Sequence, residues 1–294
     1  MDFPYLLDSQ LLSGLSHGRI EAWLQNFRDM PEAEYHAARI LAHTVYYPTT
    51  FVQQLYRKAF QDRIAWPVIR NRATESFEDP VTFRQAVDDF MQGILVVPLM
   101  DDGRPSESAN AVSRLIKQEG LVEDSQICYP ENLLLELPRF HTVVIVDDHI
   151  GSGQQVHDFW RRPRPFKTPG GSIMTTSVAE VAAQDGSKTF YCVVFAGVKS
   201  SVNQLNADLK PLTVVCPELL DERHQVFGPQ SDLWHDSDEQ SRARTCLEAF
   251  CANKGISLDG YRGMTYAYAS QLGTPDWSMP LLTHKGPAWN QLLA

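Results

Sequence analysis

Apolar residues recur every three or four positions through the first ninety residues of the chain, which is the period of helices that bury one face. On the third such stretch, Phe51, Leu55 and Phe60 fall on the predicted buried face. No strand-like run interrupts the region, so the sequence predicts a helical accessory region over residues 1–90. The helices are expected over residues 18–27, 31–47, 49–60 and 79–93.

The pattern changes near residue 91, where short runs that are apolar throughout begin to alternate with helical stretches. Strands of this kind are buried on both faces, which is typical of a parallel sheet covered by helices on each side. The pattern over residues from about 91 to 216 therefore predicts an α/β core with a doubly wound, mostly parallel sheet. The expected strands cover residues 94–100, 142–148, 189–198 and 212–216.

The end of the chain carries a weaker pattern. Residues 238–256 read as a helix ended by a glycine, and residues 263–270 alternate as a late strand would. The C-terminal tail begins near residue 258, and its last part, residues 274–293, is rich in proline and tryptophan and has no strong period. We therefore predict two parts, the helical region at 1–90 and an α/β domain at 91–294 that ends in a C-terminal extension.

The charge balance is acidic, with a formal net charge of −10 and a sequence pI near 5.3. Proteins that bind nucleic acid over a broad face carry a basic surplus, because their affinity comes largely from neutralised phosphates. The balance argues against broad nucleic-acid binding by this chain. The one dense basic run, residues 161–167, is expected to be a solvated loop.

No apolar run reaches the roughly 18 residues that indicate a membrane-spanning helix, and the N-terminus lacks the basic segment that begins a secretory signal. The five cysteines are widely spaced and form no Cys-x-x-Cys pair. Together these features predict a cytoplasmic protein with reduced thiols and no membrane partner. The sequence shows no clustered ligands that would indicate a zinc site.

Residues 143–155 combine four apolar strand residues, two aspartates and a loop of small residues that leads into a helix. Asp147 and Asp148 stand at the carboxyl end of a predicted central strand, where open parallel sheets bind their ligands. The loop amides and the helix start form an anion cradle. A ribose 5-phosphate group suits this arrangement, because carboxylates accept hydrogen bonds from its hydroxyls while the amides hold its phosphate. A buried strand with an acidic turn is the alternative.

The stretch resembles the ribose-phosphate-binding motif of type I phosphoribosyltransferases. In that family two acids follow the strand, and a phosphate loop with a Thr-Gly pair and a closing Thr comes next. Ser152 stands where the family usually has Thr, and Gln155 replaces the closing Thr. The resemblance implies a type I fold, substrate binding by the loop and by Gln155, and catalytic roles for Asp147, Asp148 and His149. The loop residues are His149, Ile150, Gly151, Ser152 and Gly153.

Other features of the chain, weaker than the motif, are similar to one branch of this family. This branch is found in prokaryotic conflict (anti-phage) systems, and some of its members accompany retron reverse transcriptases. These features are the helical N-terminal region, the loop after the first strand and the C-terminal tail. In the tail, residues 260–261, 274–277 and 280–282 fit the pattern of the branch, whereas residues 273–274 depart from its Asn. The likeness implies an effector role in antiviral defence, with a reverse transcriptase or another defence protein as partner.

The resemblance also implies a reaction, displacement at the anomeric carbon of 5-phosphoribosyl pyrophosphate. Mg²⁺ would be carried by the substrate and held indirectly by Asp147 and Asp148. The pyrophosphate should then meet the loop after the first strand, where Arg104 offers charge and Ser106 and Ser108 offer hydroxyls. The alternative for this loop is a surface turn in which a serine caps the next helix.

The sequence offers no obvious general acid or base. Many relatives carry an acid in the phosphate loop where this chain has Gly151, which leaves His149 and His157 as nearby titratable groups. Two functions stay open. One is an enzyme that transfers a phosphoribosyl group or cleaves a related ribosyl bond. The other is a catalytically inactive module that senses a nucleotide or docks on a partner.

Overall fold

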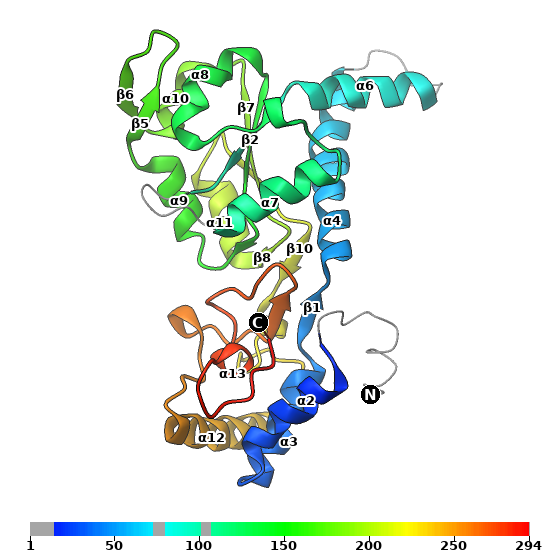
Figure 1. Cartoon of the computed structure of the whole chain (residues 1–294), viewed down its shortest axis with the longest axis vertical. Helices are drawn as coiled ribbons and strands as arrows, with labels where there is room; N and C mark the ends of the chain where they lie inside the picture. The colour runs from blue at the N-terminus through cyan, green and yellow to red at the C-terminus, as the bar shows by residue number, and fades with distance from the viewer. Residues whose placement is uncertain (1–14, 73–79, 101–106, 294) are drawn as a thin grey trace. The chain divides into compact units, whose positions relative to one another are not determined.

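The computed structural model describes residues 15–72, 80–100 and 107–293 of the chain (Figure 1). The chain falls into two compact units, one made of residues 52–219 and the other of residues 1–51 and 220–294. The predicted boundary at residue 90 lies inside residues 52–219. Because the two units are defined by packing and not by independent folding, that boundary stays a prediction.

A sheet of four parallel strands, in the order β2-β3-β7-β9, forms the centre of the 52–219 unit. All residues of the first two strands are buried, which explains why they read as uninterrupted apolar runs. The strands are β2 (Ile94–Pro98), β3 (Thr142–Val146), β7 (Thr189–Val193) and β9 (Thr213–Val215).

Helices cover both faces of this sheet (Figure 1). Buried residues of α9 (Gln154–Arg161), α10 (Val178–Gln184) and α11 (Lys199–Asp208) share one apolar cluster with the strands. Helix α7 (Glu107–Gln118) packs against β2 and β3 with residues that lie outside that cluster. The predicted α/β class with a mostly parallel sheet is therefore confirmed. Short helices complete this part: η3 (Asp124–Gln126), η4 (Pro130–Asn132), α8 (Leu133–Glu136) and η5 (Leu137–Arg139).

The helices predicted over residues 49–60 and 79–93 are present, with one error of orientation, but the helical continuation to residue 72 was not predicted. Val52, Leu55 and Tyr56 form the buried face of the first of them, whereas Phe51 is 46% exposed. Buried positions separated by three and four residues define the face, and Phe51 is one position away from it. The elements are α4 (Thr49–Lys58), the π-helical η2 (Ala59–Ala65), α5 (Trp66–Arg72) and α6 (Pro80–Gln92).

The single strand predicted over residues 189–198 is wrong, because the chain bends after β7. Strand β8 (Ala196–Val198) instead belongs to a small sheet of order β10-β8-β4, with β4 (His149–Ile150) and β10 (Glu218–Leu220). The Asp147 amide donates to the Val193 carbonyl (3.1 Å), and the Phe195 amide donates to the Asp148 carbonyl (3.2 Å). The backbone pairing thus continues through a shared bend, at which the two aspartates lie.

The basic run at residues 161–167 was expected to be a solvated loop, and this is wrong. Strand β5 (Arg164–Lys167) pairs in antiparallel fashion with β6 (Ile173–Thr176). Arg164 is 4% exposed, and its guanidinium carbon lies 4.2 Å from the centre of the Phe159 ring. Its Nη1 also donates to the Met100 carbonyl at 3.2 Å. The buried cation is stabilised by stacking on the Phe159 ring and by its hydrogen bond to the Met100 carbonyl.

The other unit is built from both ends of the chain. Helices α2 (His17–Leu24), α3 (Pro31–Ala42) and α12 (Ser237–Lys254) share one apolar cluster. Beside them, β1 (Val45–Tyr47) pairs in parallel with β11 (Tyr268–Ser270). The expectation that the first ninety residues contain no strand is therefore wrong, as is the helix predicted to continue to residue 47. Short helices here are η1 (Gln25–Phe27), η6 (Glu222–His224), η7 (Tyr261–Gly263) and α13 (Pro280–Thr283).

Specific backbone contacts hold the C-terminal tail. A Cβ on Gly260 would lie 2.6 Å from the Ser278 carbonyl oxygen, so this close approach requires glycine. Ser278 Oγ accepts from the Tyr268 amide (3.2 Å) and donates to the Tyr266 carbonyl (3.1 Å). Irregular backbone fixed in this way has no sequence period. Among the described helices, none is long and apolar enough to cross a membrane.

Candidate functional site

Residues 143–155 fold as a strand, a bend, a loop and a helix. β3 ends at Val146, Asp147 and Asp148 form the bend, and the loop after β4 leads into α9. Gly153 caps α9 with φ at 77°, the left-handed region that favours glycine. A Cβ on Gly153 would approach Leu205 Cδ1 of α11 to 3.0 Å. Glycine therefore allows both the backbone turn and the close approach of the start of α9 to α11.

Asp147 is a buried carboxyl group inside the bend, with 3% exposure. Its Oδ1 accepts from Ser108 Oγ at 3.2 Å and from the Asp148 amide at 3.0 Å. Its backbone carbonyl accepts from the Tyr56 hydroxyl at 2.7 Å. Burial, followed by the charge of Asp148, raises the pKa of Asp147 well above its ordinary value. Asp147 therefore favours the neutral acid form.

Asp148 is the ionised member of the pair. Its Oδ1 accepts from the His149 amide at 2.8 Å, and its Oδ2 lies 3.1 Å from His149 Nδ1. Burial opposes ionisation of Asp148, but the imidazole and the hydrogen bonds of His149 outweigh it and hold the pKa of Asp148 below its ordinary value. The pKa values of the two carboxyl groups therefore shift in opposite directions, because one environment favours charge and the other does not.

The loop after the bend presents backbone amides. Within the described residues, the amides of Gly151, Ser152 and Gly153 donate to no other residue. Ile150 is buried and anchors the loop, whereas Gly151 and Ser152 are partly exposed. Unpartnered amides at the start of a helix, where the helix dipole is positive, attract anions. The loop is therefore suited to a phosphate group.

The other residues predicted for the site fall into two groups. Arg104 and Ser106 lie outside the described residues. Gln155 is exposed on α9, and the side chain of His157 is 50% exposed on the same helix. Within the described residues, neither Gln155 nor His157 makes a hydrogen bond to the two aspartates.

Two side chains that support the bend were not assigned to it from the sequence. Tyr56 lies on the buried face of α4, where its spacing reads as an ordinary core aromatic. Ser108 was expected to meet pyrophosphate, whereas its hydroxyl donates to Asp147. Both contacts join residues that are far apart along the chain, so no local pattern reveals them.

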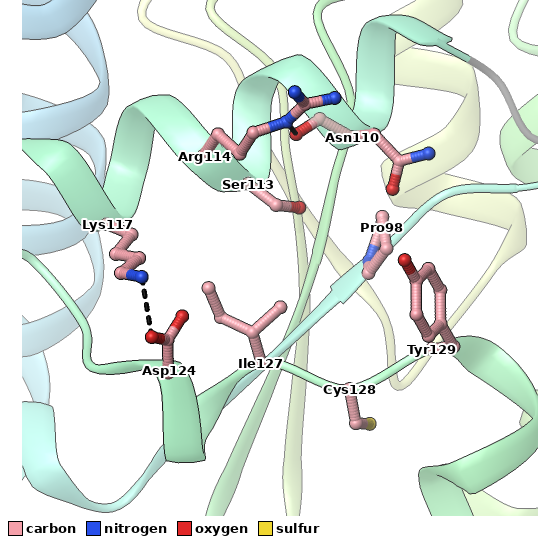
Figure 2. A pocket seen from close by; sticks show the side chains of 9 residues that line it. All are labelled: Pro98, Asn110, Ser113, Arg114, Lys117, Asp124, Ile127, Cys128 and Tyr129. Atoms are coloured by element: carbon pink, nitrogen blue, oxygen red, sulfur yellow. Dashed lines mark hydrogen bonds and ion pairs between the residues drawn. The ribbon is translucent and has the colours of Figure 1, made fainter.

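A separate cavity of about 430 Å³ lies between α7 and the segment around η3 (Figure 2). Figure 2 shows Lys117 at one side, paired with Asp124 at 2.5 Å, and Arg114 on the next turn of α7. None of its lining residues belongs to the 143–155 stretch. The cavity is therefore distinct from the site at the acid pair. It is lined by Pro98, Asn110, Ser113, Arg114, Lys117, Asp124, Ile127, Cys128 and Tyr129.

Comparison with known proteins gives one informative match. The family model PRTase-CE matches residues 20–294. The matched region takes in the acid pair, the loop and the C-terminal tail, so it rests on nearly the whole chain and not on the short motif alone. No curated protein and no solved structure matches the chain.

Proposed function

The chain belongs to the PRTase-CE family of phosphoribosyltransferase-like proteins, and we propose that it binds 5-phosphoribosyl pyrophosphate or a related ribose-phosphate ligand and transfers or cleaves a ribosyl bond. The observation that carries this proposal is the loop. Among the described residues, the amides of Gly151, Ser152 and Gly153 have no protein partner, and they directly follow Asp148 at the start of α9. A phosphate on these amides places its sugar beside the acid pair.

Asp148 is the better contact for the ribose hydroxyls. It is ionised, and its side chain is 16% exposed, whereas Asp147 is 3% exposed and favours the neutral form. Asp147 acts instead as a positioning residue, because its Oδ1 accepts from the Asp148 amide and from Ser108. In this proposal the ligand contacts Asp148 directly. Asp147 does not contact the ligand and acts by holding the bend in shape.

Mg²⁺ enters the proposal as an ion that the substrate carries. Both carboxylate oxygens of Asp148 face His149, and Asp147 is a buried acid, so the pair is not a ready cage of charged ligands. Mg²⁺ retains waters and phosphate oxygens in preference to an all-protein site, which fits this donor set. When bound, the ion would neutralise charge on the pyrophosphate.

The proposed transfer forms a bond between C1 of the ribose and the nucleophile of an acceptor, while the bond from C1 to the pyrophosphate oxygen breaks. Pyrophosphate leaves with the electron pair, and the proton of the nucleophile passes to the pyrophosphate or to water. His149 is paired with Asp148 and its side chain is 4% exposed, so we assign it the role of keeping Asp148 ionised and not that of a general base. Positioning and charge stabilisation thus supply the catalysis.

Binding without turnover is the second candidate function. It is favoured by Gly151, which leaves the loop without the acid that many relatives carry, and by the burial of His149. In this case the ribose-phosphate cradle would sense a nucleotide or control docking on a partner.

The two functions are separated by incubating the protein with 5-phosphoribosyl pyrophosphate and Mg²⁺, with and without cellular nucleotides and nucleic acids as acceptors. We expect thermal stabilisation, since ligand at about 100 times its dissociation constant adds about 2.7 kcal/mol to the free energy of unfolding. Pyrophosphate release in addition supports the transferase, and stabilisation without release supports the sensor. Asp148→Asn should lose the stabilisation, whereas Asp124→Asn, which removes the same charge at an exposed site, should keep it. Equal stabilisation of both variants, or none in the unmodified protein, would contradict the proposed site.

The biological setting of the proposal is antiviral defence in the cytoplasm, with a reverse transcriptase or another defence protein as partner. It is supported by the tail residues 260–261, 274–277 and 280–282, which resemble those of the conflict-system branch. An effector expressed without its partner should slow cell growth, and Asp148→Asn should restore growth at equal protein level. Normal growth with well-expressed unmodified protein would count against an effector role.

A further inference from the structure

Three potential metal ligands meet between two helices of the unit formed by the chain ends. Glu32 and His36 are four residues apart on α3, and Cys246 lies on α12. One ligand atom from each lies within 4.8 Å of the other two. No local sequence pattern indicates this cluster, because the helix that carries Cys246 follows α3 only after some two hundred residues.

His36 is the unusual member of the cluster. It is 5% exposed, and within the described residues neither ring nitrogen has a hydrogen-bond partner. The nearest acceptor on Glu32 is 3.8 Å from Nε2, which is too far for a hydrogen bond. Buried polar atoms are nearly always satisfied, so two unpaired nitrogens on one buried ring require an explanation.

The neighbouring charged groups do not supply that partner. Arg39 donates to Glu239 and to the Leu233 carbonyl, and Glu239 also accepts from the His235 amide at 2.8 Å. The Trp234 ring packs against the imidazole of His36 at an interplanar angle of 74°, with the two ring centres 5.7 Å apart. These groups are engaged with one another, which leaves the imidazole facing Glu32 and Cys246.

We propose that Glu32, His36 and Cys246 bind a zinc ion. Carboxylate oxygen, imidazole nitrogen and thiolate sulfur are the three donor types that zinc takes in proteins. With zinc–ligand distances of about 2.0–2.3 Å, neighbouring donor atoms of a tetrahedral site lie roughly 3.5 Å apart. The donor atoms here lie within 4.8 Å of one another, so they need to approach one another by about 1 Å. Rotation of these side chains supplies such a movement.

The charge of the three ligands and the access of solvent to the cluster both suit a divalent ion. One thiolate and one carboxylate balance its two positive charges around a neutral imidazole, so the buried site has no net charge. Binding forms a zinc–sulfur bond and releases the Cys246 thiol proton to solvent. The side chain of Glu32 is 65% exposed and marks the solvent side, where water completes the coordination.

The test uses the full-length protein, freed of metal with a chelator and titrated with Co²⁺, whose spectrum reports its ligands. We expect one equivalent to give a thiolate charge-transfer band and the visible bands of tetrahedral cobalt, and we expect Zn²⁺ to remove both. Cys246→Ala should abolish the charge-transfer band. Cys251→Ala is the matched control, since it removes another buried cysteine of α12, and it should keep the band.

Glu32→Gln provides a second variant in case Cys246→Ala does not fold, because it alters an exposed side chain. It should weaken cobalt binding by about ten-fold or more while circular dichroism stays unchanged. No charge-transfer band in the unmodified protein, a band that persists in Cys246→Ala, loss of the band in Cys251→Ala, or unchanged affinity in Glu32→Gln would each overturn the zinc site. None of these readouts depends on ribose-phosphate binding.

Discussion

The pKa values of two adjacent aspartates shift in opposite directions because their partners differ. Asp147 accepts from neutral donors in a buried bend, whereas Asp148 faces the imidazole of His149. The sequence predicted that both carboxyl groups would contact the ribose, and our proposal gives this contact to Asp148, whose side chain is the more exposed of the two. The distinction was not visible in the sequence, because Tyr56 and Ser108, which support the bend, come from distant segments.

The raised pKa of Asp147 predicts how stability depends on pH. Above the unfolded pKa of about 3.9, the unfolded chain loses its proton while folded Asp147 retains it, so this group lowers the free energy of unfolding as pH rises towards its folded pKa. Asp147→Asn retains an oxygen acceptor and removes this penalty. We expect the variant to gain stability relative to the unmodified protein as pH increases from about 4, measured by urea unfolding at a series of pH values. A difference that is flat or falls with pH would show that Asp147 is ionised in the folded protein.

At the scale of elements, the sequence predicted best where the pattern is local. The buried strands β2, β3 and β9 and the helices around them were found because continuous apolar runs and helical periods need no distant partner. Strand β1 was missed, since its partner β11 lies near the other end of the chain. The division of residues 189–198 into β7 and β8 was missed because the bend depends on pairing with the chain at Asp147.

The start of α9 should depend strongly on Gly153. Gly153→Ala introduces a Cβ at φ 77° that also meets Leu205 at 3.0 Å, so we expect a loss of about 2–3 kcal/mol in the free energy of unfolding. Gly120→Ala is a matched control, because Gly120 has φ at 65° with no atom within 4 Å, and it should cost about 1 kcal/mol. Chemical denaturation measures both. Equal losses would mean that α11 does not constrain the start of α9.

At the scale of the whole molecule, the chain ends form one unit and the middle forms the other. The acid pair and the loop lie in the 52–219 unit, and the His36 cluster and the tail lie in the other. The family match begins at residue 20 and so includes both units. Most of the first ninety residues therefore lie inside the matched region. The cluster could not be predicted, because no motif spacing joins Glu32 and His36 to Cys246.

The central claim is that the amides after Asp148 hold the phosphate of the ligand. Hydrogen–deuterium exchange of the full-length protein, with and without 5-phosphoribosyl pyrophosphate and Mg²⁺, tests it most directly. We predict that the ligand slows exchange in peptides covering residues 149–156, where the amides of Gly151, Ser152 and Gly153 lack a protein acceptor within the described residues. Peptides that line the separate cavity, residues 110–129, should exchange as before. Unchanged exchange at residues 149–156, or protection confined to residues 110–129, would contradict the account.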